Sequence, residues 1–374
     1  MLETIEDDNN GMERRIQYAT TTDEVSIALW TLGQGDPLVY VVGGPWNHLE
    51  MWDVPECRGW YERLAQKRML VGYDVRGTGL SQRDVTDFSL EARLMDLEGV
   101  IDHLNLNRFS LIGAADAGPV AISYAVRHPK KVANLILWCS WVRGADIISP
   151  RIQAWRGLIE EDWELMTDTC AHLALGWSEG EMGRRSAEYL RENVTRDVAR
   201  ASLAAGDTVD VTGLLPQVNA PTLVIHRREI PWLPVDVARA LASQIHNAQL
   251  ILLDGESTAP YLGDAEAPAD AIEDFLDSEE SGKRLPQEGG ASHLPGAAES
   301  DPERGTVEGY PDHLTEREAQ VLKLVAGGRT SREIAAELVL SLRTIERHVE
   351  NIYGKIGARN KADATAYALT RGIV

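Results

Sequence analysis

The residues with the clearest chemical meaning lie in the stretch 111–118, Leu-Ile-Gly-Ala-Ala-Asp-Ala-Gly. An apolar run comes before it and a segment with helical spacing follows, so we expect a strand, a sharp turn and a helix. In that setting the pattern Gly-x-Ser-x-Gly presents a nucleophilic serine. Here Gly113 takes the first glycine, Ala115 takes the serine and Ala117 takes the second glycine. Because a methyl group has no oxygen to attack with, we expect this turn to bind a molecule without cleaving it.

The elements that must position this turn alternate between apolar strands and amphipathic helices. Strands are expected over 17–20, 26–31, 38–42, 69–73, 132–139, 221–226 and 249–253, and helices over 90–104, 234–245 and 267–275. Such alternation predicts an α/β fold, a largely parallel sheet with helices on both faces. The strand signal stops over about 143–215, where we expect a helical cap. We place this domain at 16–276, after a frayed N-terminus at 1–15.

Three stretches together resemble the α/β-hydrolase superfamily: the loop Gly43-Gly44-Pro45-Trp46, the segment 74–81 (Asp-Val-Arg-Gly-Thr-Gly-Leu-Ser) and the turn at Ala115. The resemblance implies an α/β-hydrolase fold with a helical cap and a triad in the order Ser, acid, His. The acid is expected after the strand ending at His226, where this chain has Ile230. The histidine is expected after Leu253, where this chain has Thr258. All three positions are therefore altered, and no efficient hydrolysis is expected.

An aspartate nucleophile at the turn is the alternative that keeps catalysis. Asp116 lies one residue beyond the nucleophile position, so this reading requires a one-residue slip that the flanking motifs do not allow. It also requires a base, and the expected histidine is missing. Glu229 as a replacement acid would have no histidine to orient. We favour Asp116 as a hydrogen-bond acceptor for a ligand, with a turn residue as the simpler alternative.

Tryptophan is unusually common, with ten residues against three phenylalanines. For any single tryptophan, ordinary packing is the simpler explanation. As a set, those in the loops over the turn and in the cap suggest an aromatic pocket for a flat, largely apolar ligand. The residues expected to line it are Trp46, Ala115, Asp116, Trp141, Trp155, Ile230, Trp232 and Thr258.

The C-terminal segment 313–374 contains four expected helices joined by short links. Its first helices open with the capping boxes Thr315-Glu316-Arg317-Glu318 and Thr330-Ser331-Arg332-Glu333. The segment closely resembles the LuxR-type helix-turn-helix domain, in which the third helix enters the major groove of DNA and the fourth often pairs two copies. The resemblance implies base contacts from Glu346, Arg347 and Glu350. It implies phosphate contacts from Arg332, Arg343, Thr344 and Lys355.

Charge separates the two domains. The segment 313–374 carries ten Lys and Arg against seven Asp and Glu, whereas the rest of the chain carries 27 against 51. Residues 277–312, rich in Gly, Pro, Ser, Glu and Ala, read as a flexible linker. A modest positive charge on the tail favours a homodimer on paired half-sites. Three scattered cysteines and a polar start fit the cytoplasm, and no membrane span, metal site or cofactor is expected.

These features favour a one-component transcriptional regulator. Its non-catalytic α/β-hydrolase-like domain would sense a small, largely apolar or aromatic ligand, and its tail would bind double-stranded DNA. Two alternatives stay open at this point. One is a bifunctional esterase-like hydrolase and regulator, and the other is a scaffold whose hydrolase-like body binds a protein partner.

Overall fold

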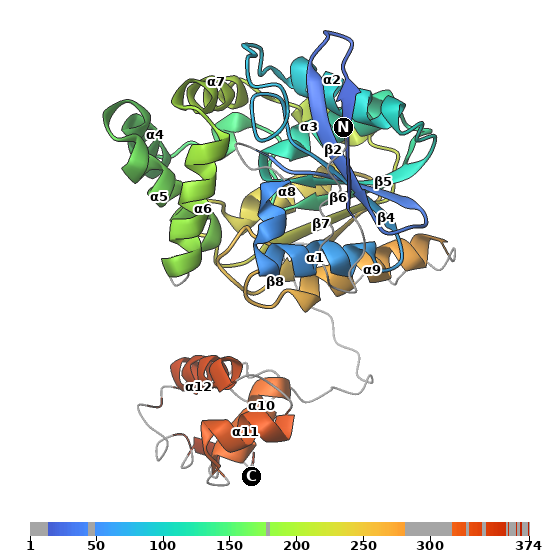
Figure 1. The fold of residues 1–374 in the computed structure, drawn as a ribbon. Helices are drawn as coiled ribbons and strands as arrows, with labels where there is room; N and C mark the ends of the chain where they lie inside the picture. The colour runs from blue at the N-terminus through green and yellow to red at the C-terminus, as the bar shows by residue number, and fades with distance from the viewer. Residues whose placement is uncertain are drawn as a thin grey trace, which may run out of the picture. The chain divides into compact units, whose positions relative to one another are not determined.

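A computed structural model describes residues 14–43, 49–176, 180–280, 316–326, 329–338 and 342–356, together with five single residues nearer the C-terminal end. The chain divides into two compact units, 1–289 and 290–374. The ribbon of each unit is drawn in Figure 1.

The first unit is built on one eight-stranded sheet with the strand order β1-β2-β4-β3-β5-β6-β7-β8. The strands are β1 Arg15–Thr20, β2 Ser26–Leu32, β3 Pro37–Val41, β4 Met69–Tyr73, β5 Phe109–Ala114, β6 Val132–Trp138, β7 Thr222–Arg227 and β8 Ala248–Leu253. The expected N-terminal hairpin is present, since Thr20 pairs with Ser26 in antiparallel β1 and β2. From β4 to β8 all pairings are parallel, which confirms the predicted α/β fold.

Helices cover both faces of this sheet. They are α1 Pro55–Ala65, α2 Leu90–His103, α3 Gly118–Arg127, α8 Val235–Gln244 and α9 Glu266–Glu280. Short 3-10 turns span Glu50–Asp53, Ala115–Ala117, Gly144–Asp146 and Thr212–Gln217. One buried cluster joins the sheet to α2, α3 and α8, and a second joins the opposite face to α1 and α9.

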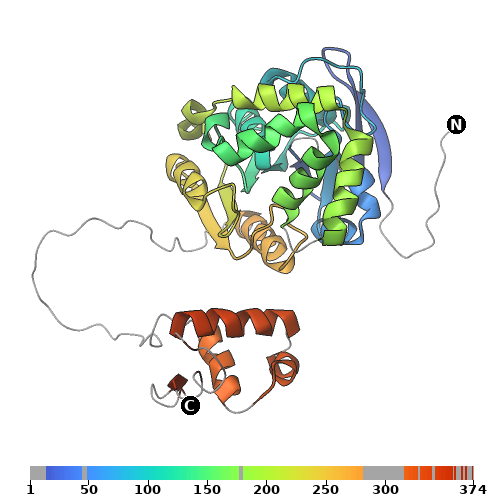
Figure 2. The ribbon, with the colours of Figure 1, turned by 90° about the vertical axis from the view of Figure 1, so that its left-hand side faces the viewer.

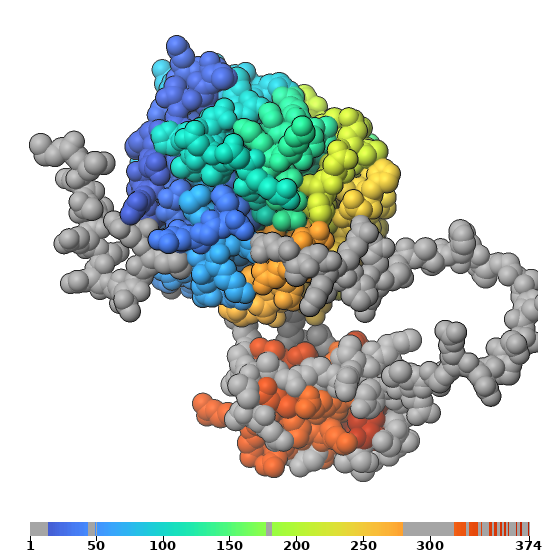
Figure 3. Space-filling view, turned by 90° about the vertical axis from the view of Figure 1, so that its right-hand side faces the viewer, coloured from blue at the N-terminus to red at the C-terminus, as the bar shows by residue number. Residues whose placement is uncertain are grey.

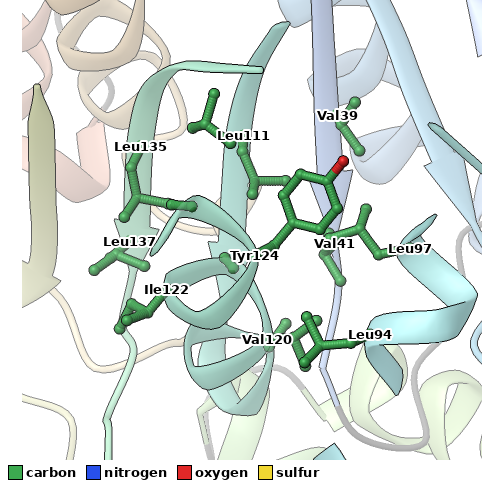
Figure 4. Close-up of a cluster of buried hydrophobic side chains, with 14 of the residues drawn as sticks. Val39, Val41, Leu94, Leu97, Leu111, Val120, Ile122, Tyr124, Leu135 and Leu137 are labelled. Atoms are coloured by element: carbon green, nitrogen blue, oxygen red, sulfur yellow. The ribbon is translucent and has the colours of Figure 1, made fainter. Parts of the chain in front are cut away.

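The first of these clusters explains why the central strands read as continuous apolar runs. A parallel strand is buried on both faces, so it lacks the polar alternation of a solvated sheet. In Figure 4 the ring of Tyr124 on α3 lies among Val39 on β3, Leu111 on β5 and Leu97 on α2. Each such aliphatic side chain contributes about 1.5–3 kcal/mol when fully buried. This packing holds α3 in place behind the end of β5.

The predicted cap is a set of four helices between β6 and β7. They are α4 Pro150–Glu161, α5 Trp163–Leu175, α6 Gly180–Asn193 and α7 Arg196–Asp207, seen in green in Figure 2. Three of them begin where a side chain accepts a hydrogen bond from the first turn: Ser149 for α4, Asp162 for α5 and Thr195 for α7. Such N-caps satisfy backbone donors that a helix start leaves without partners.

Two expected boundaries need correction. The strand β1 begins at Arg15, inside the segment that we expected to be frayed. The helix α9 continues to Glu280, so the first four residues of the expected linker are helical. Asp277 forms ion pairs with Lys67 and Arg68. The rest of the expected linker lies outside the described residues.

The face turned away from the cap is shown in Figure 3, where the blue N-terminal segments adjoin the cyan to teal segments near residue 100. This proximity agrees with the 3.3 Å hydrogen bond between the side chains of His103 on α2 and Gln17 on β1.

The second unit is all-α. Its helices are α10 Glu316–Ala326, α11 Ser331–Leu338 and α12 Leu342–Ile356. Of the expected fourth helix, the described residues Ala364, Tyr367 and Ala368 are helical. A buried cluster joins the helices, and Ile345 and Ile352 place one face of α12 in it. The structure therefore confirms an α/β domain with a helical cap, followed by a small helical domain.

Candidate ligand site and DNA interface

The turn after β5 has the backbone geometry that the sequence predicts. Ala115 has a φ of 51°, a left-handed conformation that is uncommon for any residue other than glycine. It follows the last residue of β5, and α3 begins three residues later. The side chain displayed at the tip of this turn is a methyl group.

A serine in the loop after β6 forms a hydrogen bond with this turn. The Ser140 hydroxyl donates a 2.6 Å hydrogen bond to the Ala115 carbonyl. This approach requires glycine at position 118, because a Cβ there would lie 1.7 Å from the Ser140 Oγ. The Gly118 that follows the elbow pattern therefore has a steric role that the sequence alone did not indicate.

Asp116 forms an ion pair that the sequence did not predict. Its Oδ2 lies 3.0 Å from Nη1 of Arg93 on α2, and the same Nη1 donates to the Asp116 carbonyl at 3.3 Å. Its Oδ1 lies close to Gly43, and a Cβ added at Gly43 would be only 1.7 Å from this oxygen. The carboxylate is thus held between a cation and the loop after β3. A ligand that bonds to Asp116 would share this carboxylate with Arg93.

The loop after β7 carries Ile230 and Trp232. Ile230 is buried, and the rings of Trp232 and Trp141 meet edge to face with centroids 5.8 Å apart. The Trp232 indole N–H donates a 2.8 Å hydrogen bond to the Leu173 carbonyl at the end of α5. The structure therefore brings two of the predicted aromatic residues together and fixes one of them to the cap.

The loop after β8 carries Thr258, the residue at the expected histidine position. Its backbone N–H and its hydroxyl both donate to the Ala174 carbonyl on α5, at 2.8 and 3.0 Å. Its own carbonyl accepts a 2.6 Å hydrogen bond from the Trp138 indole. The Thr258 side chain is thus engaged with the cap.

Trp155, another predicted ligand residue, is not placed with this group. The Trp155 indole donates to the Met166 carbonyl at 3.1 Å, a contact between α4 and α5 within the cap. Trp46 lies outside the described residues. A cleft of about 440 Å³ lies between residues 86–90 and residues 201–210, and none of the predicted ligand residues lines it.

Arg227 is a residue that the sequence reasoning missed. It ends β7, is 2% exposed and lies over the Trp138 ring with 5.4 Å between the guanidinium carbon and the ring centroid. Its two terminal nitrogens donate to five carbonyls of the β8–α9 loop: Ser257, Ala259, Pro260, Leu262 and Asp264. Burial lowers the pKa of this guanidinium from its ordinary value. The sequence feature that could have identified Arg227 is a cationic residue at the end of a largely apolar strand.

The second unit contains the residues predicted to contact DNA. Arg332 is exposed on α11, and Thr344 is half-buried on α12. Arg343, Glu346, Arg347 and Glu350 belong to α12. Lys355 lies 2.7 Å from the Glu318 carboxylate, so it joins α12 to α10, and a phosphate contact would compete with this ion pair.

A reciprocal cap fixes the start of α11. The Thr330 hydroxyl accepts from the Glu333 N–H at 3.3 Å, and the Glu333 carboxylate accepts from the Thr330 N–H at 2.8 Å. This is the second capping box that the sequence predicts. The first begins at Thr315, which lies outside the described residues.

Within the described part of the chain, no group of three His, Cys, Asp or Glu residues is arranged to hold a metal ion. None of the helices described is both long and apolar enough to cross a membrane.

The fold and these sites define two classes of domain in one chain, an α/β-hydrolase fold and a helix-turn-helix. The comparisons agree with both. A family model described as bacterial regulatory proteins, luxR family, matches residues 312–368. Pimeloyl-[acyl-carrier protein] methyl ester esterase of Nitrosomonas europaea is 30% identical over 256 residues, covering 63% of this chain and 94% of the esterase. The AB hydrolase superfamily protein YisY of Bacillus subtilis is 24% identical over 277 residues, covering 70% of this chain and 99% of YisY.

Solved structures support the same fold. An esterase from Exiguobacterium antarcticum aligns with a TM-score of 0.62 at 20% identity, covering 70% of this chain and 99% of the esterase. The chain therefore belongs to the α/β-hydrolase superfamily through its N-terminal unit. Its C-terminal domain is a LuxR-type DNA-binding domain, which assigns the protein to transcription regulation.

Proposed function

We propose that this protein is a one-component transcriptional regulator whose α/β-hydrolase unit binds a small, largely apolar or aromatic ligand without hydrolysing it. The observation that carries the proposal is the turn at Ala115. Its backbone has the left-handed conformation of a nucleophile elbow, but the side chain is a methyl group. Left-handed backbone at a residue other than glycine costs about 1–3 kcal/mol, and alanine gains no nucleophile in return.

The contacts of Thr258 and Asp116 support the non-catalytic part of the proposal. A general base must be free to take a proton from a nucleophile. The hydroxyl at the expected base position is bonded to the Ala174 carbonyl, and Asp116 is paired with Arg93. Any residual acceleration would come from backbone donors alone, which contribute independently of a triad.

The surroundings of Ala115 support an apolar ligand. Trp141 belongs to a buried cluster, and partly buried side chains pack against that cluster: Ala115, Trp232 and the cap residues Met182 and Tyr189. Aromatic and aliphatic walls with few polar groups suit a flat ligand whose orientation is set by one or two hydrogen bonds. The ligand would regulate DNA binding only if it binds two states of the protein with unequal affinity. A homodimer on paired half-sites is the expected DNA-bound form.

The test is a titration of the full chain with a metabolite library, in which binding is monitored by tryptophan fluorescence. All ten tryptophans lie in the first unit, so the signal reports on that unit alone. We expect a saturable change with a ligand that mass spectrometry recovers unchanged. Trp232→Phe should reduce the signal more than Trp155→Phe, which serves as the matched control. A ligand recovered hydrolysed, with loss of turnover in Asp116→Ala, would overturn the proposal and make Asp116 a nucleophile.

A second experiment tests the assigned positions. The triple variant Ala115→Ser, Ile230→Asp, Thr258→His restores all three residue types of a hydrolase triad. If the positions are right, it should hydrolyse a p-nitrophenyl ester faster than Ala115→Ser alone. Equal rates in the two variants would show that the positions do not converge.

A further inference from the structure

The loop between β8 and α9, residues 254–265, has two sides with different partners. Its carbonyls face the sheet, where Arg227 binds five of them and Trp138 binds that of Thr258. Its hydroxyls face the cap, where Ser257 and Thr258 both donate to the Ala174 carbonyl at 3.0 Å.

The cap side of this contact is the end of α5. The last carbonyls of a helix have no partner within the helix. Here the Leu173 carbonyl accepts from the Trp232 indole, and the Ala174 carbonyl accepts from the loop. Gly176 then turns the chain with a φ of 101°. A small apolar cluster accompanies these bonds and joins Leu175 to Ala259 and Leu262 of the loop.

We propose that the β8–α9 loop and Trp232 form a latch that holds the cap closed over Ala115, and that the regulatory ligand acts by releasing this latch. The inference rests on the proposed ligand-sensing function. Its physical basis is an asymmetry. The sheet holds the loop through six hydrogen bonds to the carbonyls of the loop, whereas four hydrogen bonds to two helix-end carbonyls hold the cap. When the two separate, the loop stays with the sheet and α5 moves.

The same contacts indicate that the ligand acts at Trp232. The rings of Trp232 and Trp141 meet edge to face, and the Trp232 indole N–H bonds to the Leu173 carbonyl. A flat ligand inserted beside Trp141 displaces this ring and so removes a latch bond. The loop also leads directly into α9, whose first turn is capped by the Asp264 carboxylate at 3.1 Å. The latch is therefore adjacent in sequence to α9, the last helix that the structure describes in the first unit.

Hydrogen exchange of the full chain, measured without any ligand, tests the latch. Thr258→Val removes one hydroxyl donor with little change in shape, and Trp232→Phe removes the indole donor but keeps an aromatic ring. Each lost bond should speed the exchange of amides at the end of α5 by about fivefold, and the double variant by about thirtyfold. Amides of β5, β6 and β7 should not change, because core strands exchange through global unfolding.

Two controls separate the latch from a general loss of stability. Thr258→Ser keeps the donor and should exchange like the unmodified protein. Thr208→Val removes a hydroxyl that donates to the Ala205 carbonyl at the end of α7, also at a helix end in the cap, and should leave α5 unchanged. Unchanged α5 exchange in both Thr258→Val and Trp232→Phe overturns the latch, as does an equal rise in the central strands.

These outcomes are independent of the ligand titration. A protein that binds and returns a ligand unchanged but shows no latch effect keeps the proposed function and loses this inference. A latch effect in a protein that hydrolyses its ligand gives the reverse result, a cap latch in an enzyme.

Discussion

Replacing Arg227 with methionine should destabilise the first unit strongly. The guanidinium is 2% exposed and donates to five backbone carbonyls at 2.7–3.4 Å. Among the described residues it has no salt bridge, so backbone dipoles and the Trp138 face compensate its charge. Methionine fills a similar volume but supplies no donor. Four buried carbonyls and the part-buried carbonyl of Asp264 would then lose this partner.

The expected loss follows from two opposing terms. Each buried acceptor that loses its donor costs about 1–3 kcal/mol. Removing the buried charge relieves its desolvation, which is worth several kcal/mol per ion. The balance predicts that the free energy of unfolding falls by about 3–5 kcal/mol in Arg227→Met. Arg227→Lys should lose nearly as much, because a compact ammonium cannot span five carbonyls.

Urea denaturation followed by tryptophan fluorescence measures this loss in the first unit alone, since the second unit has no tryptophan. The matched control is Arg228→Met on the next residue. Arg228 is exposed and lies 3.7 Å from the Asp254 carboxylate, so its loss should change stability by less than about 1 kcal/mol. Equal effects of the two substitutions, or a loss in Arg227→Met below about 1 kcal/mol, would refute the role assigned to the carbonyl contacts.

Three further predictions concern single substitutions. Ala115→Gly should stabilise the first unit by about 0.5–1 kcal/mol by relieving the left-handed strain, whereas Ala114→Gly, at a φ of −100°, should destabilise it by a similar amount; urea denaturation checks both, and losses in both would contradict the strain argument. The hydrogen bond from Arg76 lowers the pKa of Asp23 below its ordinary 3.8, so Asp23→Asn should lower stability by about 1 kcal/mol near neutral pH, with the difference vanishing as pH falls through the lowered pKa; a difference that persists in acid would exclude the ion pair as its source. Arg347→Ala should weaken binding to a DNA site selected from a random pool by about 1–3 kcal/mol in fluorescence anisotropy, and Arg347→Lys should recover non-specific affinity but not discrimination between bases.

The alternation of apolar strands and helices was sufficient to predict the sheet. The strand β4 was predicted at residues 69–73 and lies there, because its apolar run has clear polar borders. The end of α9 was placed too early because residues 277–280 are polar and acidic. Their helical conformation is supported by ion pairs of Asp277 with Lys67 and Arg68, which lie between α1 and β4. Local composition does not reveal these contacts.

In the candidate site, too, some features were predictable from the sequence and others were not. The sequence by itself determined that position 115 carries a methyl group and that 258 and 230 carry neither a histidine nor an acid. Side-chain chemistry is local, so no structure is needed to know what these residues can do. The capping box at Thr330 was equally readable, because its two partners are three residues apart.

Only the tertiary structure decided which partners the remaining groups have. Arg93 meets Asp116 across 23 residues of sequence, Arg227 reaches carbonyls more than thirty residues away, and Thr258 bonds to a helix 84 residues earlier. Such contacts depend on how strands are ordered in the sheet and on how the cap packs against the loops that follow them. The type of a polar side chain determines which hydrogen bonds it can make. The tertiary fold determines which atom lies close enough to be its partner.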